Sequence, residues 1–123
     1  MIGYTTLGTN DLPRAAAFYD ELFGVIGVKR LMDFGRGYAW GASMDKPGFG
    51  VMKPFDGQAA TVGNGVMVAL VVDSKAKVDA LHAKALELGG CCEGKPGARG
   101  EGFYAAYFRD LDGNKLNAFY VGA

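Results

Sequence analysis

Residues 103–121 read FYAAYFRDLDGNKLNAFYV, two apolar, aromatic-rich runs on either side of a polar turn. The turn itself, residues 109–114, reads RDLDGN. Asp and Asn side chains close local hydrogen bonds to the backbone, and Gly113 can adopt a positive φ without a Cβ clash. The stretch is therefore predicted to form a β-hairpin whose second strand, Lys115 to Val121, completes the fold.

The composition indicates one folded globular domain. Its 123 residues suit a single domain, and a hydrophobic content of 50% is ordinary for a folded chain. The 13 basic and 13 acidic side chains cancel without forming a basic run, which gives no reason to expect nucleic acid or an anionic membrane as a partner. No apolar run reaches the roughly 18 residues of a membrane span, and no signal peptide is apparent. The only two cysteines are adjacent and unlikely to form a bridge, so we expect a reduced, cytoplasmic protein.

The rest of the chain repeats one order of elements. A strand is predicted first, then a helix that begins after an Asn, Asp or Ser cap and ends at glycine, then three strands. The predicted ranges are strand 2–8, helix 10–23 and strands 25–33, 38–44 and 49–54, followed by strand 65–72, helix 74–88, a short strand at 91–93 and the closing hairpin. An internal duplication with an offset of about 63 residues explains this order, with modules at about 1–57 and 65–123.

Three stretches together resemble the glyoxalase I, bleomycin-resistance and extradiol-dioxygenase superfamily, the vicinal oxygen chelate fold. They are residues 2–12, IGYTTLGTNDL, the helix residues Ala17-Phe18-Tyr19, and residues 110–114, DLDGN. The resemblance implies an α+β fold with two tandem βαβββ modules. These would form a curved eight-stranded mixed sheet with the helices on its convex side and an open concave face. It also implies a homodimer with the cavities near the subunit interface.

The resemblance further places the metal-ligand positions of the family's catalytic members, which use His, Gln or Glu. On this chain those positions fall on Tyr4, Met67 and Asn117, and the fourth falls within residues 49–53, which include no His, Asp, Glu or Gln. Divalent metals of this kind prefer imidazole and carboxylate ligands. We therefore expect no metal and no other cofactor.

Tyr4, Met67 and Asn117 are predicted to face one concavity, either as a pocket for a planar or aromatic ligand or as side chains that merely fill a former metal site. Trp40, Met52, Tyr104 and Arg99 complete the predicted ligand-binding set. Strand alternation allows only about half of the aromatic residues to face the cavity, and the others would pack in the core. Arg99 would bind an anionic group or remain a solvated loop charge.

The thiols and the only histidine are assigned structural roles. Cys91 and Cys92 are adjacent, which disfavours a disulfide between them. A thiolate nucleophile needs a nearby base or cation, and none is evident, so buried structural thiols are expected. His82 lies on the second predicted helix, on the convex side, and is expected to be a packing histidine.

Three functions are compatible with this pattern. The first is a dimeric protein that binds a small hydrophobic or aromatic molecule, as bleomycin-resistance proteins do. The second is a metal-dependent lyase of the glyoxalase I (lactoylglutathione lyase) type, an isomerase or a dioxygenase, which would need unusual metal ligands. The third is a metal-free enzyme that uses Tyr4 as a general acid, although nothing adjacent would lower the pKa of its phenol.

Overall fold

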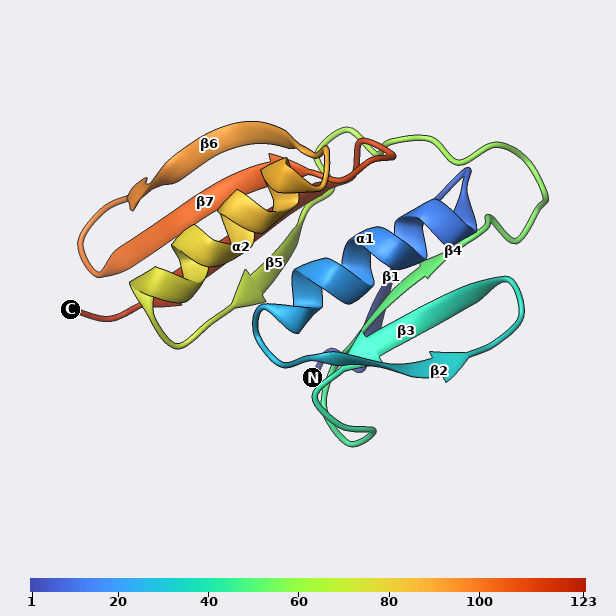
Figure 1. The fold of residues 1–123 in the computed structure, drawn as a ribbon, viewed down its shortest axis with the longest axis horizontal. Helices are drawn as coiled ribbons and strands as arrows, with labels where there is room; N and C mark the ends of the chain where they lie inside the picture. Colours follow the sequence, from blue (N-terminus) through green and yellow to red (C-terminus); the bar gives the residue numbers. More distant parts are fainter.

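The computed structural model describes residues 1–123 and has the predicted α+β architecture (Figure 1). Its elements are β1 (Tyr4–Gly8), α1 (Leu12–Gly24), β2 (Lys29–Asp33), β3 (Gly37–Gly41), β4 (Gly48–Met52), β5 (Val68–Val71), α2 (Lys75–Glu87), β6 (Cys91–Ala98), β7 (Phe103–Arg109) and β8 (Lys115–Val121). Neither helix is long and apolar enough to cross a membrane.

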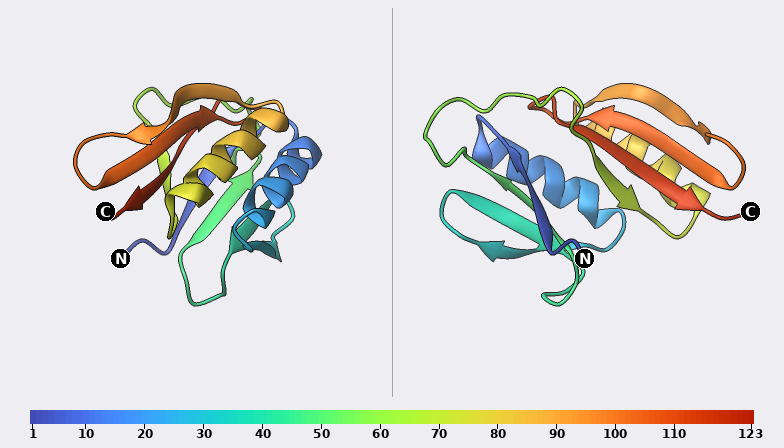
Figure 2. Two further views of the ribbon diagram at one scale, coloured as in Figure 1. Left: turned by 60° about the vertical axis from the view of Figure 1, so that its left-hand side comes forward. Right: turned by 180° about the vertical axis from the view of Figure 1, so that it is seen from behind.

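The two modules have the same sheet topology. The eight strands form two four-stranded sheets, in the orders β1-β4-β3-β2 and β5-β8-β7-β6. In each sheet the first strand of the module pairs in parallel with the last, and the other pairs are antiparallel. The repeated order confirms the two βαβββ modules. Seen from behind, both sheets lie in front of the helices, so each sheet has one helix-covered face and one face free of helices (Figure 2).

Both helices begin at the predicted caps. Asp11 accepts a hydrogen bond from the Arg14 backbone N–H at 3.1 Å, and Ser74 accepts one from the Lys77 N–H at 3.2 Å. These bonds satisfy amide groups that have no partner within the first turn of a helix. The predicted helices therefore agree with the structure to within one or two residues at each end.

Two strand boundaries differ from the prediction by four or five residues, and the other strand boundaries by three or fewer. The strand predicted at 25–33 begins only at Lys29, because the chain turns after α1 through Gly27, whose φ is +70°. Strand β6 extends to Ala98, well beyond the predicted 91–93, and its pairing with β7 is interrupted by two register shifts. Regular strand pairing is interrupted where residues 94–97 contain two glycines and a proline, and such a sequence is typical of a loop.

An aromatic cluster forms the core between α1 and the first sheet. The Tyr19 ring lies 5.7 Å from the Trp40 ring and 4.9 Å from the Phe49 ring, and Phe23 lies 5.0 Å from Phe49 (centroid distances). All four side chains are buried. The indole N–H of Trp40 donates to Asp20 of α1 at 2.8 Å, which satisfies its one polar atom and fixes the orientation of the ring.

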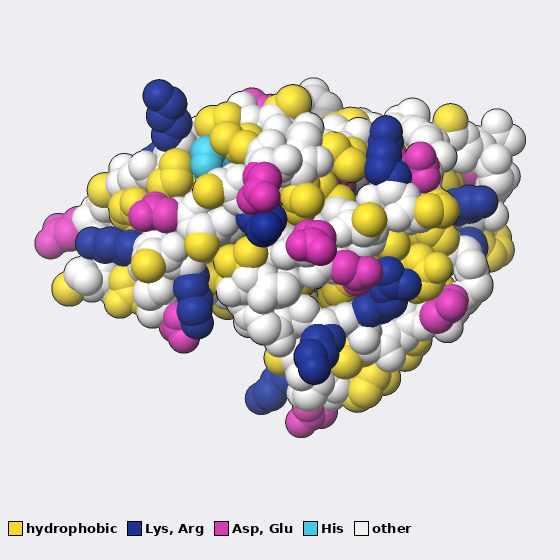
Figure 3. Space-filling model, in the orientation of Figure 1, with side chains coloured by type: hydrophobic (Ala, Val, Ile, Leu, Met, Phe, Trp, Pro, Cys, Tyr) yellow, Lys and Arg dark blue, Asp and Glu magenta, His cyan; other side chains and the backbone are white.

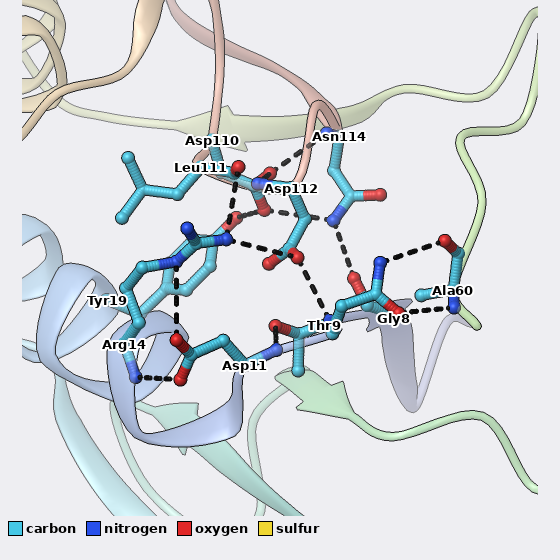
Figure 4. A network of polar contacts seen from close by, with 11 residues as sticks. Gly8, Thr9, Asp11, Arg14, Tyr19, Ala60, Asp110, Leu111, Asp112 and Asn114 are labelled. Carbon is cyan, nitrogen blue, oxygen red and sulfur yellow. Dashed lines mark hydrogen bonds and ion pairs between the residues drawn. The ribbon is translucent and has the colours of Figure 1, made fainter. Parts of the chain in front are cut away.

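The turn between β7 and β8 joins the two modules through a polar network (Figure 4). The Tyr19 hydroxyl donates to Asp110 Oδ2 at 2.6 Å, and Asn114 Nδ2 donates to the Gly8 carbonyl at 2.9 Å. Asp112 Oδ1 accepts from the Asn10 N–H at 3.0 Å. Burial, and then the Asp110 carboxylate, raises the pKa of the Tyr19 phenol well above its ordinary value. The DLDGN turn therefore fixes module two against the β1–α1 corner of module one.

Candidate functional site

The helix-free face of the first sheet contains a hollow of about 440 Å³. Its lining residues are Gly3, Tyr4, Thr6, Leu31, Met32, Phe34, Arg36, Ala39, Trp40, Ser43, Met44, Lys46, Gly48, Gly50 and Met52. We call it the first-sheet hollow. Strand alternation explains its position, because Phe49 and Val51 of β4 point into the core and leave the intervening residues facing the hollow.

The floor of the first-sheet hollow is made of residues with little or no side chain. Ala39 of β3 pairs with Gly50 of β4. Gly48 lies two residues before Gly50 on the same strand and so faces the same side. A Cβ at Gly50 would lie 3.2 Å from the Thr5 carbonyl oxygen and 3.3 Å from Thr6 Cγ2, tighter than ordinary contact. Thr6 therefore covers Gly50, which is buried, and the floor is partly open only at Gly48 and Ala39, which are half-buried.

The walls are apolar and flexible. Leu31, Met32 and Phe34 rise from β2 and the turn after it, Met44 from the β3–β4 loop, and Met52 from the end of β4. Met44 is 69% exposed and Met32 43% exposed, so both side chains are available to contact a ligand. Methionine side chains are unbranched and polarisable, so they adapt to ligands of irregular shape.

Two cations and no carboxylate border the hollow. Arg36 donates through Nε to the Lys53 carbonyl at 3.2 Å, and its guanidinium lies 5.1 Å from the centre of the Phe55 ring. Lys46 makes no ion pair. Since no Asp or Glu lines the hollow, its electrostatic potential favours a neutral or negatively charged guest.

Of the predicted ligand-binding residues, Tyr4 and Met52 lie in this hollow with side chains on its open face. Tyr4 is 75% exposed, so its phenol is available to a ligand. Whether either residue binds a ligand stays a prediction.

Trp40 and Tyr104 both point toward the helices. Trp40 borders the hollow, but its side chain is fully buried on the helix side, bonded to Asp20. The Tyr104 hydroxyl donates to Asp79 of α2 at 2.7 Å, which raises the pKa of its phenol. Both rings therefore lie on the helix side of their sheets, as expected for about half of the aromatic residues, because each strand points these positions at its own helix. Whether either residue contacts a ligand stays a prediction.

The remaining three predicted residues belong to the second module. Met67 lines a separate hollow with residues 62–66, Arg109 and Lys115. Asn117 is 2% exposed, and its Nδ2 donates to the Ala106 carbonyl at 3.0 Å. The Arg99 guanidinium lies 5.6 Å from the centre of the Tyr107 ring and donates to the Lys95 carbonyl at 2.6 Å. Tyr4, Met67 and Asn117 thus do not share one hollow within a single chain.

Taken with the predicted duplication offset, the sheet registers indicate where the fourth family metal position would fall. Tyr4 pairs with Gly48, and Thr6 with Gly50, while Ala69 pairs with Asn117. With the duplication offset, Thr6 corresponds to Ala69, so Gly50 corresponds to Asn117. The first module therefore offers a glycine where the second offers a buried amide.

These positions do not fit a divalent metal. A phenol, a glycine, a thioether and a carboxamide with its N–H₂ already bonded provide no imidazole and no carboxylate. The fold also contains no group of three or more His, Cys, Asp or Glu side chains that could hold a metal ion.

Sequence reasoning missed most of the walls of the hollow. Leu31, Met32, Phe34 and Met44 were assigned to strands or turns without a functional role. An available signal was the run Gly48-Phe49-Gly50, in which alternate glycines face one side of a strand and leave room for a guest.

Comparison with known proteins places this architecture in one family. The family model described as Glyoxalase/Bleomycin resistance protein/Dioxygenase superfamily matches residues 1–118. No curated protein sequence matches the chain.

Solved structures agree with the family match. The chain is similar to a glyoxalase/bleomycin resistance protein from Albidiferax ferrireducens T118, with 33% identity, 98% of each chain covered and a TM-score of 0.89. It is also similar to the hypothetical protein SA1046 from S. aureus, with 26% identity, 98% and 92% coverage and a TM-score of 0.74. A lactoylglutathione lyase from Agrobacterium tumefaciens shares the fold at 22% identity, with 98% and 92% coverage and a TM-score of 0.71. This chain belongs to the Glyoxalase/Bleomycin resistance protein/Dioxygenase superfamily.

Proposed function

We propose that this protein is a cytoplasmic homodimer that binds a small hydrophobic or aromatic molecule in the first-sheet hollow, without a divalent metal. The observation that carries the proposal is the hollow itself, a glycine and alanine floor enclosed by apolar walls. Such concave, mostly apolar sites are typical of small-molecule binding. The family positions that would hold a metal offer no suitable donor set.

The charges at the rim refine the class of ligand. Lys46 is free of ion pairs and Arg36 lies on the same hollow, so an aromatic or apolar body with one acidic group suits the site better than a cation. A carboxylate would form a charge-assisted hydrogen bond with either side chain. Tyr4 offers a hydroxyl as a second polar contact.

Dimerisation is supported by the exposed edges of the two sheets. Strands β1 and β5 each pair on one side only. Apolar side chains are exposed along or just before them, with Ile2 at 55%, Val66 at 53% and Val71 at 70%. Burial of such a surface against a second copy would remove it from water and enclose the open side of the hollow.

The proposal is tested by ligand-induced stabilisation of metal-stripped protein. Naphthoate should raise the melting temperature in a concentration-dependent way, because it binds only the folded state, and neutral naphthamide should raise it less. Lys46→Gln should reduce that difference, whereas Lys75→Gln on α2 should not. Absence of any stabilisation by aromatic compounds would contradict the proposed ligand class.

Metal content separates the proposed binding protein from an enzyme of the glyoxalase type. The purified protein should hold much less than one equivalent of zinc, nickel, iron or manganese, even after these ions are added. It should not turn over the methylglyoxal–glutathione adduct. One tightly bound equivalent accompanied by turnover would establish the lyase instead.

A further inference from the structure

Helix α2 and strand β6 bring the only histidine of the chain against a cysteine. His82 Nε2 lies 3.3 Å from Cys92 Sγ. This distance lies within hydrogen-bond range for sulfur, and the Sγ atom is the only hydrogen-bond partner found for the His82 side chain. The expected separation of the thiols from any base is therefore wrong, because the sheet pairing that places Cys92 opposite Phe108 turns it toward α2.

The thiol is exposed, whereas the imidazole is largely covered by its neighbours. Both cysteines are exposed, whereas His82 is only 7% exposed. The predicted burial of the thiols is thus also wrong. Viewed from the helix side, the histidine appears as a small patch among hydrophobic side chains (Figure 3). A small electrophile can reach the sulfur atom while the base behind it is held in place by packing.

The surroundings keep the imidazole uncharged near neutral pH. Burial lowers the pKa of His82, and the nearby Asp79 carboxylate opposes this effect only in part. Asp79 itself accepts a hydrogen bond from the Tyr104 hydroxyl. A neutral imidazole with its Nε2 lone pair directed at the sulfur can accept a proton from the thiol.

We propose that Cys92 is a reactive thiol that adds to soft carbon electrophiles of the α,β-unsaturated carbonyl class, with His82 as its positioned base. The sulfur forms a bond to the β carbon of the electrophile as the thiol proton moves to Nε2. The π-electron pair of the carbon–carbon double bond moves to the α carbon, which then takes the proton from Nε2. The product is a thioether that contains every atom of both reactants, so no oxidant or reductant is required.

Cys91 is a matched internal control. It is adjacent to Cys92 on β6 and also exposed, but it pairs with Arg109 and points to the opposite face of the strand. It has no histidine within reach, because the chain has only one. The Arg109 guanidinium opposite Cys91 is already paired with the Glu93 carboxylate, so the imidazole beside Cys92 is the main chemical difference between the two thiols.

The experiment measures acrylamide addition to the folded full-length chain by intact mass spectrometry. Cys91→Ser leaves only Cys92, and Cys92→Ser leaves only Cys91. Cys92 is expected to react about tenfold faster, since a positioned base assists proton removal. In urea, where the contact with His82 is lost, the two variants should react at similar rates. Equal rates in the folded state would overturn the proposal.

A second set of variants tests the role of His82. His82→Gln should slow Cys92 to about the rate of Cys91 when combined with Cys91→Ser, and should leave the rate unchanged when combined with Cys92→Ser. Circular dichroism melting verifies that each variant is folded. If the glutamine variant does not fold, His82→Asn replaces it. The difference in reaction rate between Cys91→Ser and Cys92→Ser then still tests the proposal, because it needs no His82 variant. An unchanged Cys92 rate in a folded His82 variant would assign the reactivity to exposure alone and contradict the proposal.

Discussion

The Asp110 side chain accepts more hydrogen bonds than any other side chain in the protein. Its carboxylate accepts hydrogen bonds from the Tyr19 hydroxyl, from the backbone N–H groups of Asp112 and Asn114, and from Asn114 Nδ2. It is 5% exposed, so water cannot replace these bonds. One side chain therefore shapes the DLDGN turn and fixes that turn against α1 of the other module (Figure 4).

Asp110→Ala should lower the free energy of unfolding by about 3 kcal/mol, because it leaves several buried donors without an acceptor. Tyr19→Phe removes one of the four bonds and should cost about 1 kcal/mol. Urea denaturation of both variants provides the comparison. Equal losses would show that the turn is not organised by the carboxylate.

At the scale of elements, the pattern of caps, glycine stops and hairpin turns was sufficient to locate both helices and all eight strands. It was not sufficient to orient the strands. Alternation does not say which set of side chains faces the helix until the register is known, and so it did not place Trp40 and Tyr104 on the helix side of their sheets. The shift in pairing between Arg30 and Met32 on β2 further determines which apolar residues reach the hollow, and no local signal reveals it.

Side-chain contacts that depend on strand register were also inaccessible to sequence reasoning. His82 and Cys92 are ten residues apart on a helix and on a strand with an irregular register. The family resemblance indicated the convex position of His82 correctly. It could not indicate that the strand would turn Cys92, rather than Cys91, toward that helix.

Helix α2 should give the protein a pH-dependent stability through His82. Since the folded state holds the pKa of His82 below its ordinary value of 6.5, the unfolded chain binds more protons, and stability falls as the pH drops below about 6.5. The slope for one such group is at most about 1.4 kcal/mol per pH unit. Urea denaturation of the wild type and of His82→Gln between about pH 7 and pH 5 measures this slope.

Asp73 and Glu93 do not contribute to the pH dependence of stability in this range. Asp73 and Glu93 have pKa values lowered by Lys77 and Arg109, so the stability that they contribute is lost only at pH values below their ordinary pKa values of 3.8 and 4.5. Between about pH 7 and pH 5 the free energy of unfolding of His82→Gln should therefore change less with pH than that of the wild type. The same slope in both proteins would show that His82 is not responsible.

At the scale of the whole molecule, each of the two modules has its helix on one face of its sheet only. The opposite face of the first sheet, which contains the first-sheet hollow, is therefore free of helices. The edges of β1 and β5 carry exposed apolar side chains beside that face. A second copy of the chain is the partner that we propose for these edges.

Val71→Lys should therefore dissociate the dimer, because it places a charge in the buried centre of the expected contact. The measurement is the mass in solution by light scattering, which should fall from twice the chain mass of 13.0 kDa to that of one chain. Leu86→Lys, a similar exposed position on α2, is the control and should leave the dimer intact. A wild-type protein that is monomeric at all concentrations would contradict this account.

The central claim is that the first-sheet hollow holds an apolar ligand with no help from a metal. The most direct measurement is a fluorescence titration of EDTA-treated protein with anilinonaphthalene sulfonate, an aromatic anion. The wild type and Ala17→Phe, altered on an exposed position of α1, should each bind it saturably. Ala39→Phe fills the floor of the hollow and should abolish that binding while the protein remains folded. Equal binding by Ala39→Phe, or binding that appears only after a divalent metal is restored, would contradict the account.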